Sequence, residues 1–511
     1  MVEAKTVKKD AYLMGIDVGT SSLKAVLLDE KARQVASVHS SYRMFAPQTG
    51  WTGIDGDSLW EALLCCVRSL RDDRGADLSR VEGIGFSVLC PALILMEEGG
   101  GILAGPIPYS DRRSTVQASC IEAKAGRERL FSITANGSMA GGFSGSSLLW
   151  LRENQPQAYE KARWFGHLNS WLALKMTGQT AIDPTNASYT NLFDTVKECW
   201  SEEMCALLEV EMEKLPPLKQ AFEPAGALNC VELLALGLPR GIPVVTGAGD
   251  TPCAALAAGV TRDGDVCESA GTTNVLTVCV DRPIFDPRFI NRCHLVPGTW
   301  TYQGSMSFTG AANQWFCRQF YGEGQTGGKD LFAIANGDAA KAAPGCGGVV
   351  FLPYMQGERS PVWDPHARGV FFGLTLSATK ADMNRAVLES CAYGLRQFLE
   401  IAEERTGRPV ERFASIGGGS KSRVWAQIKA DVTGRTIEVL DREDMAACGA
   451  ALLAGVGAGV WKDLQEASDT VERPVWKVFE PGHASDRVYA RNYSVYCSLY
   501  PALKDLFPQI R

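Results

Sequence analysis

The N-terminal part of the chain contains three short runs of apolar positions. Residues 12–18 and 23–28 are mostly apolar, and residues 34–42 alternate more loosely between apolar and polar side chains. A Gly-Thr-Ser-Ser segment at 19–22 separates the first two runs. Short apolar or alternating runs joined by small turn residues are typical of neighbouring β-strands. The pattern therefore predicts a three-stranded meander.

A helix is predicted next, over about residues 57–70. Apolar side chains at 59, 60, 63, 64, 67 and 70 fall on one helical face, and Asp57 is the expected N-cap. Residues 81–89 and 92–95 are again short apolar runs, which predicts two more strands. Alternating strands and helices indicate an α/β layer architecture.

The second half of the chain repeats the first turn. Residues 271–281 align with residues 19–29 at four identical positions of eleven, which favours an internal duplication. Farther on, residues 382–406 have helical periodicity, and a strand at 413–416 leads through three glycines into a helix at 422–432. A strand, glycine turn and helix in this order place a helix N-terminus where a nucleotide phosphate can bind.

The length of the chain and its net charge limit the number of domains and the kind of partner that we expect. A chain of 511 residues exceeds one ordinary core, so two or three domains are expected. No low-complexity linker separates them, and we expect them to meet across a cleft, with a boundary near residues 250–265. The net charge of −7 argues against a nucleic-acid partner, because nucleic-acid binding normally requires a clustered basic face.

The cysteines and the apolar segments indicate in which cellular compartment the protein is located. Sixteen cysteines are scattered without a Cys-x-x-Cys pair, as is typical of buried thiols in a reducing cytosol. The first ten residues are polar and charged. The small-apolar run 445–460 is interpreted as a tightly packed helix of small residues, and it falls short of the roughly twenty residues that span a bilayer. We therefore expect a cytoplasmic protein with no membrane partner.

The first glycine turn has the composition of a phosphate site. Gly19, Thr20, Ser21 and Ser22 follow Asp17 closely in the sequence. Small residues leave amide N–H groups free for phosphate oxygens, and the hydroxyls add donors. Asp17 is suited to hold Mg²⁺ through water. An ordinary polar hairpin turn is the alternative, and these residues alone leave both open.

A single carboxylate lies in a glycine-rich segment about twenty residues before a second glycine turn. Asp250 stands between Gly-Ala-Gly and Thr-Pro, and Gly271, Thr272 and Thr273 follow about twenty positions later. The glycines permit a tight turn that presents the carboxylate to a hydroxyl as a base. A surface Asx turn is the alternative. Two phosphate-type turns and one base together predict phosphoryl transfer from a nucleotide to a hydroxyl.

Three further patterns are less specific. Asp111 and Arg113 follow a strand-like segment, where they either bind substrate hydroxyls or form a surface ion pair. The segment 417–420, Gly-Gly-Gly-Ser, could hold an adenine or a ribose against bare backbone, although it is not a dinucleotide fingerprint and the chain has no P-loop. Cys253, next to apolar residues and far from any histidine in sequence, is interpreted as a buried thiol.

These motifs, together with two C-terminal segments separated by seven residues, resemble the FGGY family of carbohydrate kinases. The segments follow one another in that family's order and span about residues 12 to 460: Asp17-Val-Gly-Thr-Ser-Ser, Gly249-Asp250, Gly271-Thr-Thr, Gly369-Val-Phe-Phe-Gly373-Leu374, Asp382-Met-Asn-Arg-Ala386-Val-Leu-Glu389 and Gly417-Gly-Gly. The C-terminal signature, residues 369–374 and 382–389, is matched position for position.

The resemblance implies two ribonuclease H-like domains, as in actin and the heat-shock ATPases, around a central cleft that binds ATP and a small-molecule sugar. Residues 1–257 would contain the sugar site, the first phosphate hairpin and the catalytic Asp250, and residues 258–511 would bind the nucleotide. Asp17 and Asp250 are the implied Mg²⁺ residues. The implied nucleotide and phosphate contacts are Gly19, Thr20, Ser21, Ser22, Lys24, Gly271, Thr272, Thr273, Gly310, Gln314, Gly418, Gly419 and Ser420.

Within the family, residues 351–361 are most similar to xylulokinases, which implies D-xylulose as acceptor. Family habit suggests a homodimer. Cys90-Pro91 and Thr251 depart from the Met-His and Asn that xylulokinases commonly carry. Another acceptor, such as ribulose, gluconate or another polyol, and a catalytically silent sugar or nucleotide sensor therefore stay open as alternatives. The implied sugar contacts are Leu89, Cys90, Asp111, Arg113, Asp250 and Thr251.

Overall fold

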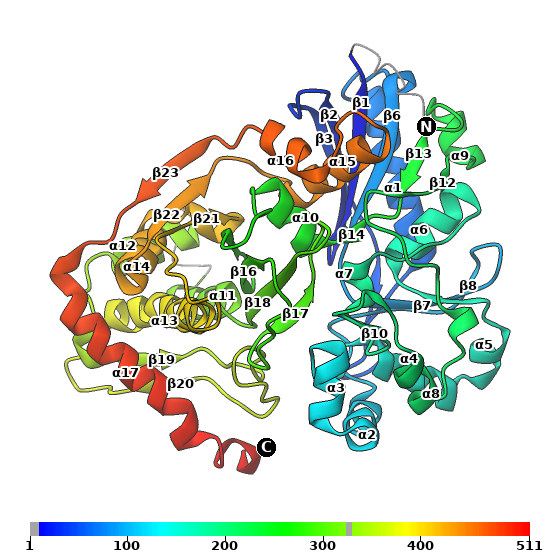
Figure 1. The fold of residues 1–511 in the computed structure, drawn as a ribbon. Coiled ribbons are helices and arrows are strands. Elements are labelled where there is room, and N and C mark those ends of the chain that lie inside the picture. The colour runs from blue at the N-terminus through cyan, green and yellow to red at the C-terminus, as the bar shows by residue number, and fades with distance from the viewer. Residues whose placement is uncertain (1–9, 323–329, 511) are drawn as a thin grey trace.

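The computed structural model describes residues 10–322 and 330–510, and it has two halves that each contain a seven-stranded sheet (Figure 1). The N-terminal half, blue to green in the figure, lies beside the C-terminal half, green to red. The N-terminal sheet consists of β1 (Tyr12–Val18), β2 (Ser22–Asp29), β3 (Gln34–Ser41), β6 (Val81–Val88), β12 (Pro224–Ala227), β13 (Pro243–Val245) and β14 (Ala248–Gly249).

In the N-terminal sheet the strand order is β12-β13-β6-β1-β2-β3, with β14 pairing with β6. β1, β2 and β3 form the predicted antiparallel meander, and β6 lies parallel to β1 on its other side. The register sets Asp17 opposite Lys24 on β2 and beside Ser87 on β6. The sheet therefore carries the first glycine turn at the end of β1, next to the end of β6.

The C-terminal sheet has the order β17-β18-β16-β15-β21-β22-β23. β15 and β16 are antiparallel, β16 pairs antiparallel with β18, and β21 and β22 continue parallel to β15. Its strands are β15 (Val266–Ala270), β16 (Asn274–Val280), β17 (Ile290–Cys293), β18 (Trp300–Met306), β21 (Arg412–Ile416), β22 (Thr436–Leu440) and β23 (Val475–Phe479).

The two sheets share a topology. In each, three neighbouring antiparallel strands (β1-β2-β3 and β15-β16-β18) are extended by strands parallel to the first of the three, and a glycine turn joins the first two strands, at residues 19–21 and 271–273. This is the arrangement expected of two ribonuclease H-like units, and the predicted α/β architecture is confirmed.

Helices cover the sheets. The N-terminal sheet packs against α1 (Gly56–Asp72) and α6 (Leu168–Thr177), and the C-terminal sheet packs against α13 (Lys380–Thr406) and α14 (Arg423–Thr433). Other helices of the C-terminal half include α11 (Gly310–Tyr321), α12 (Leu331–Ala339), α16 (Leu464–Thr470) and α17 (Asp486–Leu503), beside the ribbon β19 (Val350–Leu352) and β20 (Val370–Phe372).

A smaller α/β segment extends from the N-terminal sheet, at the lower right of Figure 1. It has a three-stranded sheet of order β8-β7-β9 packed against helices. Its main elements are β7 (Ala92–Met96), β8 (Ile102–Pro108), β9 (Trp164–Gly166), α2 (Thr115–Ala125), α3 (Arg127–Thr134), α4 (Ser144–Asn154), α5 (Pro156–Lys161), α7 (Pro184–Ala187) and α8 (Glu202–Leu208). Shorter elements of the half are β4 (Met44–Phe45), β5 (Gly53–Ile54), β10 (Phe193–Asp194), β11 (Cys199–Trp200) and α9 (Val231–Ala235).

Two helices pack together between the halves, α10 (Asp250–Ala257) and α15 (Met445–Gly457). α15 belongs to the C-terminal half of the chain but lies on β1 and β6 of the N-terminal sheet. Glycines make this close approach possible, because a Cβ at Gly15 would lie 1.9 Å from the carbonyl oxygen of Ala447, and one at Gly85 would lie 2.1 Å from that of Ala450. The predicted small-residue helix thus joins the C-terminal half of the chain to the N-terminal sheet.

One local prediction was wrong. Asp55 rather than Asp57 caps α1, since the Asp55 carboxylate accepts a hydrogen bond from the Ser58 amide at 3.1 Å while Asp57 lies in the first turn. The helix of residues 382–406 is confirmed and begins slightly earlier, at Lys380. Among the helices that the structure describes, none is both long and apolar enough to cross a membrane.

Candidate functional site

The first part of the site lies at the end of β1. Asp17 Oδ1 accepts a hydrogen bond from the Ser87 hydroxyl at 2.7 Å. Burial, together with the negative charge of Asp250, raises the pKa of Asp17 to about 7. A hydrogen bond from Ser87 opposes this shift because it favours the charged form. Asp17 and Asp250 are thus close enough to repel each other electrostatically.

The glycine turn after Asp17 presents free polar groups. Gly19 is tied into the turn by a hydrogen bond from its amide to the Ser22 carbonyl, 3.1 Å long, and its carbonyl accepts from the Tyr42 hydroxyl. The side chains of Thr20 and Ser21 are exposed, and their amides donate to no acceptor among the described residues. The Thr20 hydroxyl lies 3.3 Å from the Tyr109 hydroxyl, so within the described chain the free groups of the turn are the two amides and the Ser21 hydroxyl, which are suited to phosphate oxygens.

Lys24, expected beside the phosphate, forms an ion pair instead of pointing into open solvent. Its Nζ lies 2.9 Å from Asp444 Oδ1, at the residue that precedes α15. The hydrogen bond and charge of Asp444 raise the pKa of Lys24 against the effect of its partial burial. The pair joins the strand after the first turn to the helix between the halves.

Asp250 is the first residue of α10, and Gly249 is the N-cap. Asp250 Oδ1 accepts hydrogen bonds from the amide and the hydroxyl of Thr251, at 2.6 and 3.2 Å, whereas Oδ2 accepts none from the described residues. Burial raises the pKa of Asp250, and the positive charge of Arg292 opposes that shift. The carboxylate therefore stands at a helix start, half-buried, with one oxygen available for a ligand. This is not the surface Asx turn of the alternative interpretation.

Three predicted nucleotide segments converge in the C-terminal half. Gly310, at the start of α11, packs against the turn at 271–273, because the Ala311 amide donates to the Thr272 carbonyl at 3.0 Å. The segment 417–420 packs on the other side of the same strand end, since a Cβ at Gly417 would lie 2.6 Å from the Ala270 carbonyl.

Within these segments, Gly418 faces open space, and Ser420 donates its hydroxyl back to the Gly417 carbonyl at 2.7 Å. Gln314 is half-buried, one turn into α11. Bare backbone from three chain segments thus surrounds one end of the C-terminal sheet, which is the arrangement expected of a nucleotide site.

The predicted sugar contacts divide into two groups. Leu89 is buried and its amide donates to the Val18 carbonyl at 2.9 Å, which places Cys90 directly beyond the end of β6. Cys90 is half-buried, and burial raises the pKa of its thiol well above the usual value. Together with Thr251, these residues lie around Asp250.

Asp111 and Arg113 form the second group. Arg113 donates to both carboxylate oxygens of Asp111, each at 2.9 Å, and its guanidinium lies between Trp51 and Trp150. The Thr52 amide donates to Asp111 Oδ2 at 2.7 Å. The pair is buried rather than a surface ion pair, and protein donors occupy both oxygens of the carboxylate.

Arg292 was not predicted from the sequence as a site residue. This residue, on β17, is 1% exposed, and its Nη1 donates to the Tyr189 hydroxyl at 3.3 Å. Its only signal in the sequence is a charged residue within a short buried strand, which does not indicate what the side chain faces. Cys253, by contrast, is fully buried as predicted, and burial raises the pKa of its thiol well above the usual value.

A metal would have to be shared with the nucleotide. Among the described residues, no group of three or more His, Cys, Asp or Glu could hold an ion by itself. Mg²⁺ is commonly bound by one or two carboxylates together with water and substrate phosphates. Two carboxylates that repel each other, Asp17 and Asp250, beside a turn with free amides fit that type of site.

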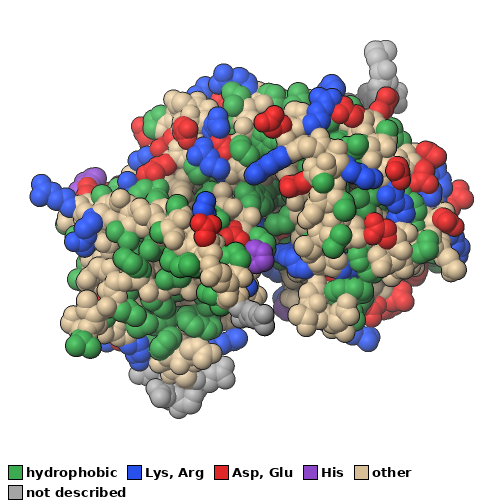
Figure 2. Space-filling view, turned by 90° about the horizontal axis from the view of Figure 1, so that it is seen from below, with side chains coloured by type: hydrophobic (Ala, Val, Ile, Leu, Met, Phe, Trp, Pro, Cys, Tyr) green, Lys and Arg blue, Asp and Glu red, His purple; other side chains and the backbone are tan. Residues whose placement is uncertain are grey.

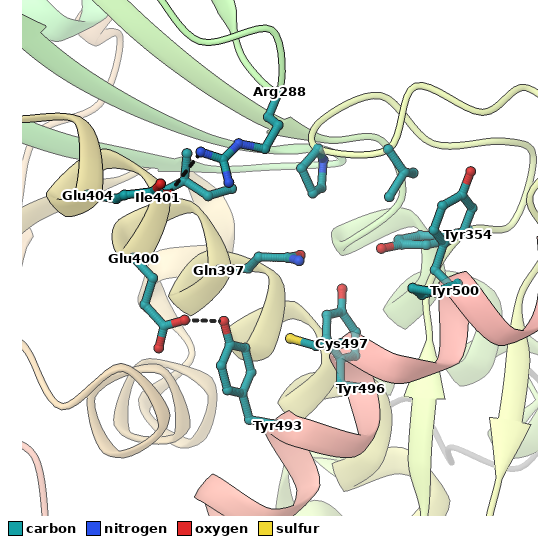
Figure 3. Close-up of a pocket in the computed structure, with 13 residues that line it drawn as sticks. Arg288, Tyr354, Gln397, Glu400, Ile401, Glu404, Tyr493, Tyr496, Cys497 and Tyr500 are labelled. Carbon is teal, nitrogen blue, oxygen red and sulfur yellow. Dashed lines mark hydrogen bonds and ion pairs between the residues drawn. The ribbon is translucent and has the colours of Figure 1, made fainter.

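The molecule has a cleft between its two halves and, away from that cleft, a separate cavity. Seen from below, the molecule is hollowed between its two halves, with charged side chains on both rims (Figure 2). A cavity of about 450 Å³ lies elsewhere, between α13, α17 and the segment 354–362 (Figure 3). Four tyrosines and Gln397 line it, and Gln397 points toward its middle. None of the predicted site residues lines this cavity, so the site is assigned to the region around Asp17 and Asp250.

Comparison with models of known protein families gives two matches. Residues 12–257 match the model of the N-terminal domain of the FGGY family of carbohydrate kinases, and residues 267–458 match the model of its C-terminal domain. The two matches together cover most of the chain and include both glycine turns and Asp250.

Individual proteins are similar over nearly the full length. A xylulose kinase of Staphylococcus epidermidis is 29% identical over 97% of this chain and 97% of its own. A glycerol kinase of Dechloromonas aromatica is also 29% identical, over 94% of this chain and 95% of its own. The crystal structure of a xylulose kinase from Rhodospirillum rubrum has a TM-score of 0.88 at 30% identity, covering 97% of this chain and 99% of that one.

Proposed function

The chain belongs to the FGGY family of carbohydrate kinases, and from this premise we propose that it transfers the γ-phosphoryl group of ATP to a hydroxyl of a ketopentose. Family membership makes it a phosphotransferase that uses ATP and acts on an alcohol group of a sugar or polyol. The proposed acceptor is D-xylulose, with D-xylulose 5-phosphate as product.

The acceptor proposal is supported by similarity to xylulose kinases. Such proteins match over nearly the whole chain, and residues 351–361 resemble the corresponding segment of that group. A glycerol kinase has the same sequence identity to this chain, 29%, as the xylulose kinase of Staphylococcus epidermidis. Cys90 and Thr251 also differ from the residues common in xylulokinases. The same chemistry on ribulose, gluconate or another polyol is therefore the second candidate.

The observation that carries the proposed chemistry is the position of Asp250. Its carboxylate begins a helix beside Asp17, with one oxygen turned to no protein donor among the described residues. A base that accepts the proton of an attacking hydroxyl needs such an available oxygen. In phosphoryl transfer the base orients the nucleophile and accepts the proton late, while positioning of the phosphate supplies most of the rate.

The two glycine turns are assigned to the phosphates in this proposal. Thr20 and Ser21 would contact the transferring group, Gly271 to Thr273 the other phosphates, and Gly310, Gln314 and residues 418–420 the nucleoside. Asp17 and Asp250 would hold Mg²⁺ together with the phosphates, and the ion would offset their charge. Residues 1–257 and 258–511 would be the two domains, with α10 and α15 between them.

Coupled measurement of ADP release tests the proposal. The purified protein with ATP and Mg²⁺ is supplied with D-xylulose, D-ribulose, glycerol, gluconate and other sugars and polyols. D-xylulose is expected to give the highest kcat/KM. Activity on another acceptor alone would replace D-xylulose and retain the kinase. ADP release that is independent of any acceptor, or no release at all, would contradict the proposed transfer.

A further inference from the structure

Arg292 is buried with most of its hydrogen-bonding capacity unused. The residue is 1% exposed, and only Nη1 has a partner, the Tyr189 hydroxyl at 3.3 Å. Nε and Nη2 are buried and donate to no described residue. No carboxylate of the described residues lies within ion-pair distance, although the charge of Arg292 influences Asp250. Burying a cation with unpaired donors is costly, which indicates that a ligand completes the site.

The guanidinium is located next to the proposed base. A Cβ built on Gly249 would lie 3.6 Å from Arg292 Nη1 and 3.6 Å from the Cβ of Cys90. Gly249 directly precedes Asp250, and Cys90 is one of the predicted sugar contacts. Arg292 therefore extends from β17 of the C-terminal sheet to the side of Asp250 where the acceptor is proposed to bind.

Besides the free oxygen of Asp250, two buried groups near this position are donors that no described residue uses, the Nε–Nη2 edge of Arg292 and the indole of Trp363. Trp363 packs on the cluster formed by Phe143, Tyr189 and Ile290, against which Cys90 also packs, and its indole nitrogen is buried without a partner. Each hydroxyl of a polyol contributes a proton that needs an acceptor of its own. A carbonyl or carboxylate oxygen only accepts, so it matches a donor-rich surface better.

We infer that Arg292 is a specificity-determining residue that donates from Nε and Nη2 to a carbonyl-type oxygen of the acceptor. Nε and Nη2 form one edge of the guanidinium, a fork that matches a carboxylate bidentately and also fits a ketone beside a hydroxyl. Two sources share this chemistry, the ketone of a ketose and the carboxylate of a sugar acid. The inference rests on the proposed sugar-kinase function and narrows its substrate class.

Three five-carbon acceptors separate the possibilities: D-xylulose with a ketone, D-xylonate with a carboxylate and xylitol with neither. Wild-type protein is expected to prefer one of the first two over xylitol by at least about tenfold in kcat/KM, within the range seen when a buried site loses its hydrogen-bonding partner. The preferred compound identifies the source. Equal or better use of xylitol would overturn the inference.

Two variants test the residue directly. Arg292→Met keeps much of the side-chain length without donors, and Arg292→Lys keeps the charge without the fork. Arg292→Met is expected to raise KM for the preferred acceptor at least about tenfold, with a smaller change for xylitol, because xylitol lacks the oxygen that Arg292 binds. Arg292→Lys is expected to retain part of the preference. A loss of the same size for all three acceptors would indicate a structural role instead.

Thermal unfolding supplies a readout that does not depend on turnover. Arg385, which is also buried but paired with Glu389 at 2.8 Å, is the matched control. Arg385→Met is expected to lower the unfolding midpoint, whereas Arg292→Met should not lower it, because no ion pair is broken. D-xylulose or D-xylonate should raise the thermal unfolding midpoint of the wild-type protein and not that of Arg292→Met. If the wild-type protein releases no ADP with any acceptor, the proposed kinase function fails. The rise in unfolding midpoint with D-xylulose or D-xylonate still decides whether Arg292 binds either compound. If neither compound raises the midpoint of the wild-type protein, the inference is overturned.

Discussion

The carbonyl oxygen of Gly271 occupies the space where a side chain on Gly310 would begin. A Cβ at Gly310 would lie only 2.1 Å from that oxygen, and the neighbouring Ala311 amide donates to the Thr272 carbonyl at 3.0 Å. The start of α11 thus holds the second glycine turn in position by direct backbone contact. The contact couples the proposed phosphate turn to the helix that carries Gln314.

Gly310→Ala is expected to weaken ATP binding. The added methyl group must push the turn at 271–273 away, because a backbone carbonyl cannot yield as a flexible side chain can. We expect KM for ATP to rise at least about tenfold, with a smaller effect on KM for the sugar, since a 1 Å displacement of positioning groups is costly in transfer reactions. Initial-rate kinetics with each substrate varied in turn measure both constants.

Gly337→Ala is the matched control for this change. Gly337 lies in α12, and a Cβ there would meet nothing within 4 Å. The control is expected to keep both KM values within about twofold and to stabilise its helix slightly. An unchanged KM for ATP in Gly310→Ala would show that the turn at 271–273 does not position the phosphates.

Asp250→Ala is expected to lower turnover at least about a hundredfold, the usual scale for loss of a general base. Nucleotide binding, measured by calorimetry in the absence of sugar, should change little, because the nucleoside contacts are assigned to the other half. Cys253→Ala, one turn along the same helix and fully buried, is the control and should keep near-normal turnover. Near-normal turnover in Asp250→Ala would exclude this residue as the base.

Gly85→Ala is expected to destabilise the contact between α15 and the N-terminal sheet. The new Cβ would lie 2.1 Å from the Ala450 carbonyl oxygen, so α15 would have to move off β6. Overpacking of this kind typically costs about 1–3 kcal/mol. Thermal unfolding should show a lower midpoint, whereas Gly99→Ala, where a Cβ would meet nothing within 4 Å, should leave it unchanged. Equal midpoints would mean that α15 does not lie on this sheet.

Local pattern predicted the elements well because short-range forces decide them. The alternating runs and the glycine turn at 19–22 correctly predicted the first meander, and the periodicity of 382–406 correctly predicted the long helix. The cap of α1 was missed because Asp55 and Asp57 both precede the apolar face, and only backbone geometry distinguishes them.

Long-range partners could not be predicted in the same way. Lys24 pairs with Asp444, and Arg292 lies beside Gly249 and Cys90, although these residues are far apart in the chain. The small-residue composition of 445–460 correctly indicated a closely packed helix, but not that it covers the N-terminal sheet. Such contacts depend on how the two sheets are arranged, which no single segment encodes.

Glu358 is expected to make stability depend on pH. Its Oε1 accepts hydrogen bonds from the amides of Ser307 and Arg359, both at 2.7 Å, while Oε2 is buried without a partner among the described residues. Burial raises the pKa of Glu358 from 4.5 to about 7, and the two amide hydrogen bonds oppose this shift. The folded protein therefore keeps the proton in a range where the unfolded chain has lost it.

The sign of the effect follows from proton binding. Between about pH 4.5 and pH 7 the folded state binds more protons than the unfolded state at this residue, so the free energy of unfolding falls as pH rises. One such group contributes a slope of at most about 1.4 kcal/mol per pH unit. Below this range both states are protonated, and above it both are ionised, so the contribution to the slope disappears.

Glu358→Gln removes the titration and keeps an oxygen for the two amides. Its unfolding free energy relative to wild type should therefore rise across pH 4.5 to 7 and then level off. The absolute level can be lower at acid pH, because the new amide nitrogen brings a buried donor that lacks a partner. The decisive quantity is the difference in slope between variant and wild type, measured by urea unfolding at several pH values. Glu98→Gln, an exposed site, should show no such difference in slope. Parallel pH curves for Glu358→Gln and wild type would mean that Glu358 is already ionised in the folded protein and that a cation or a donor meets its second oxygen.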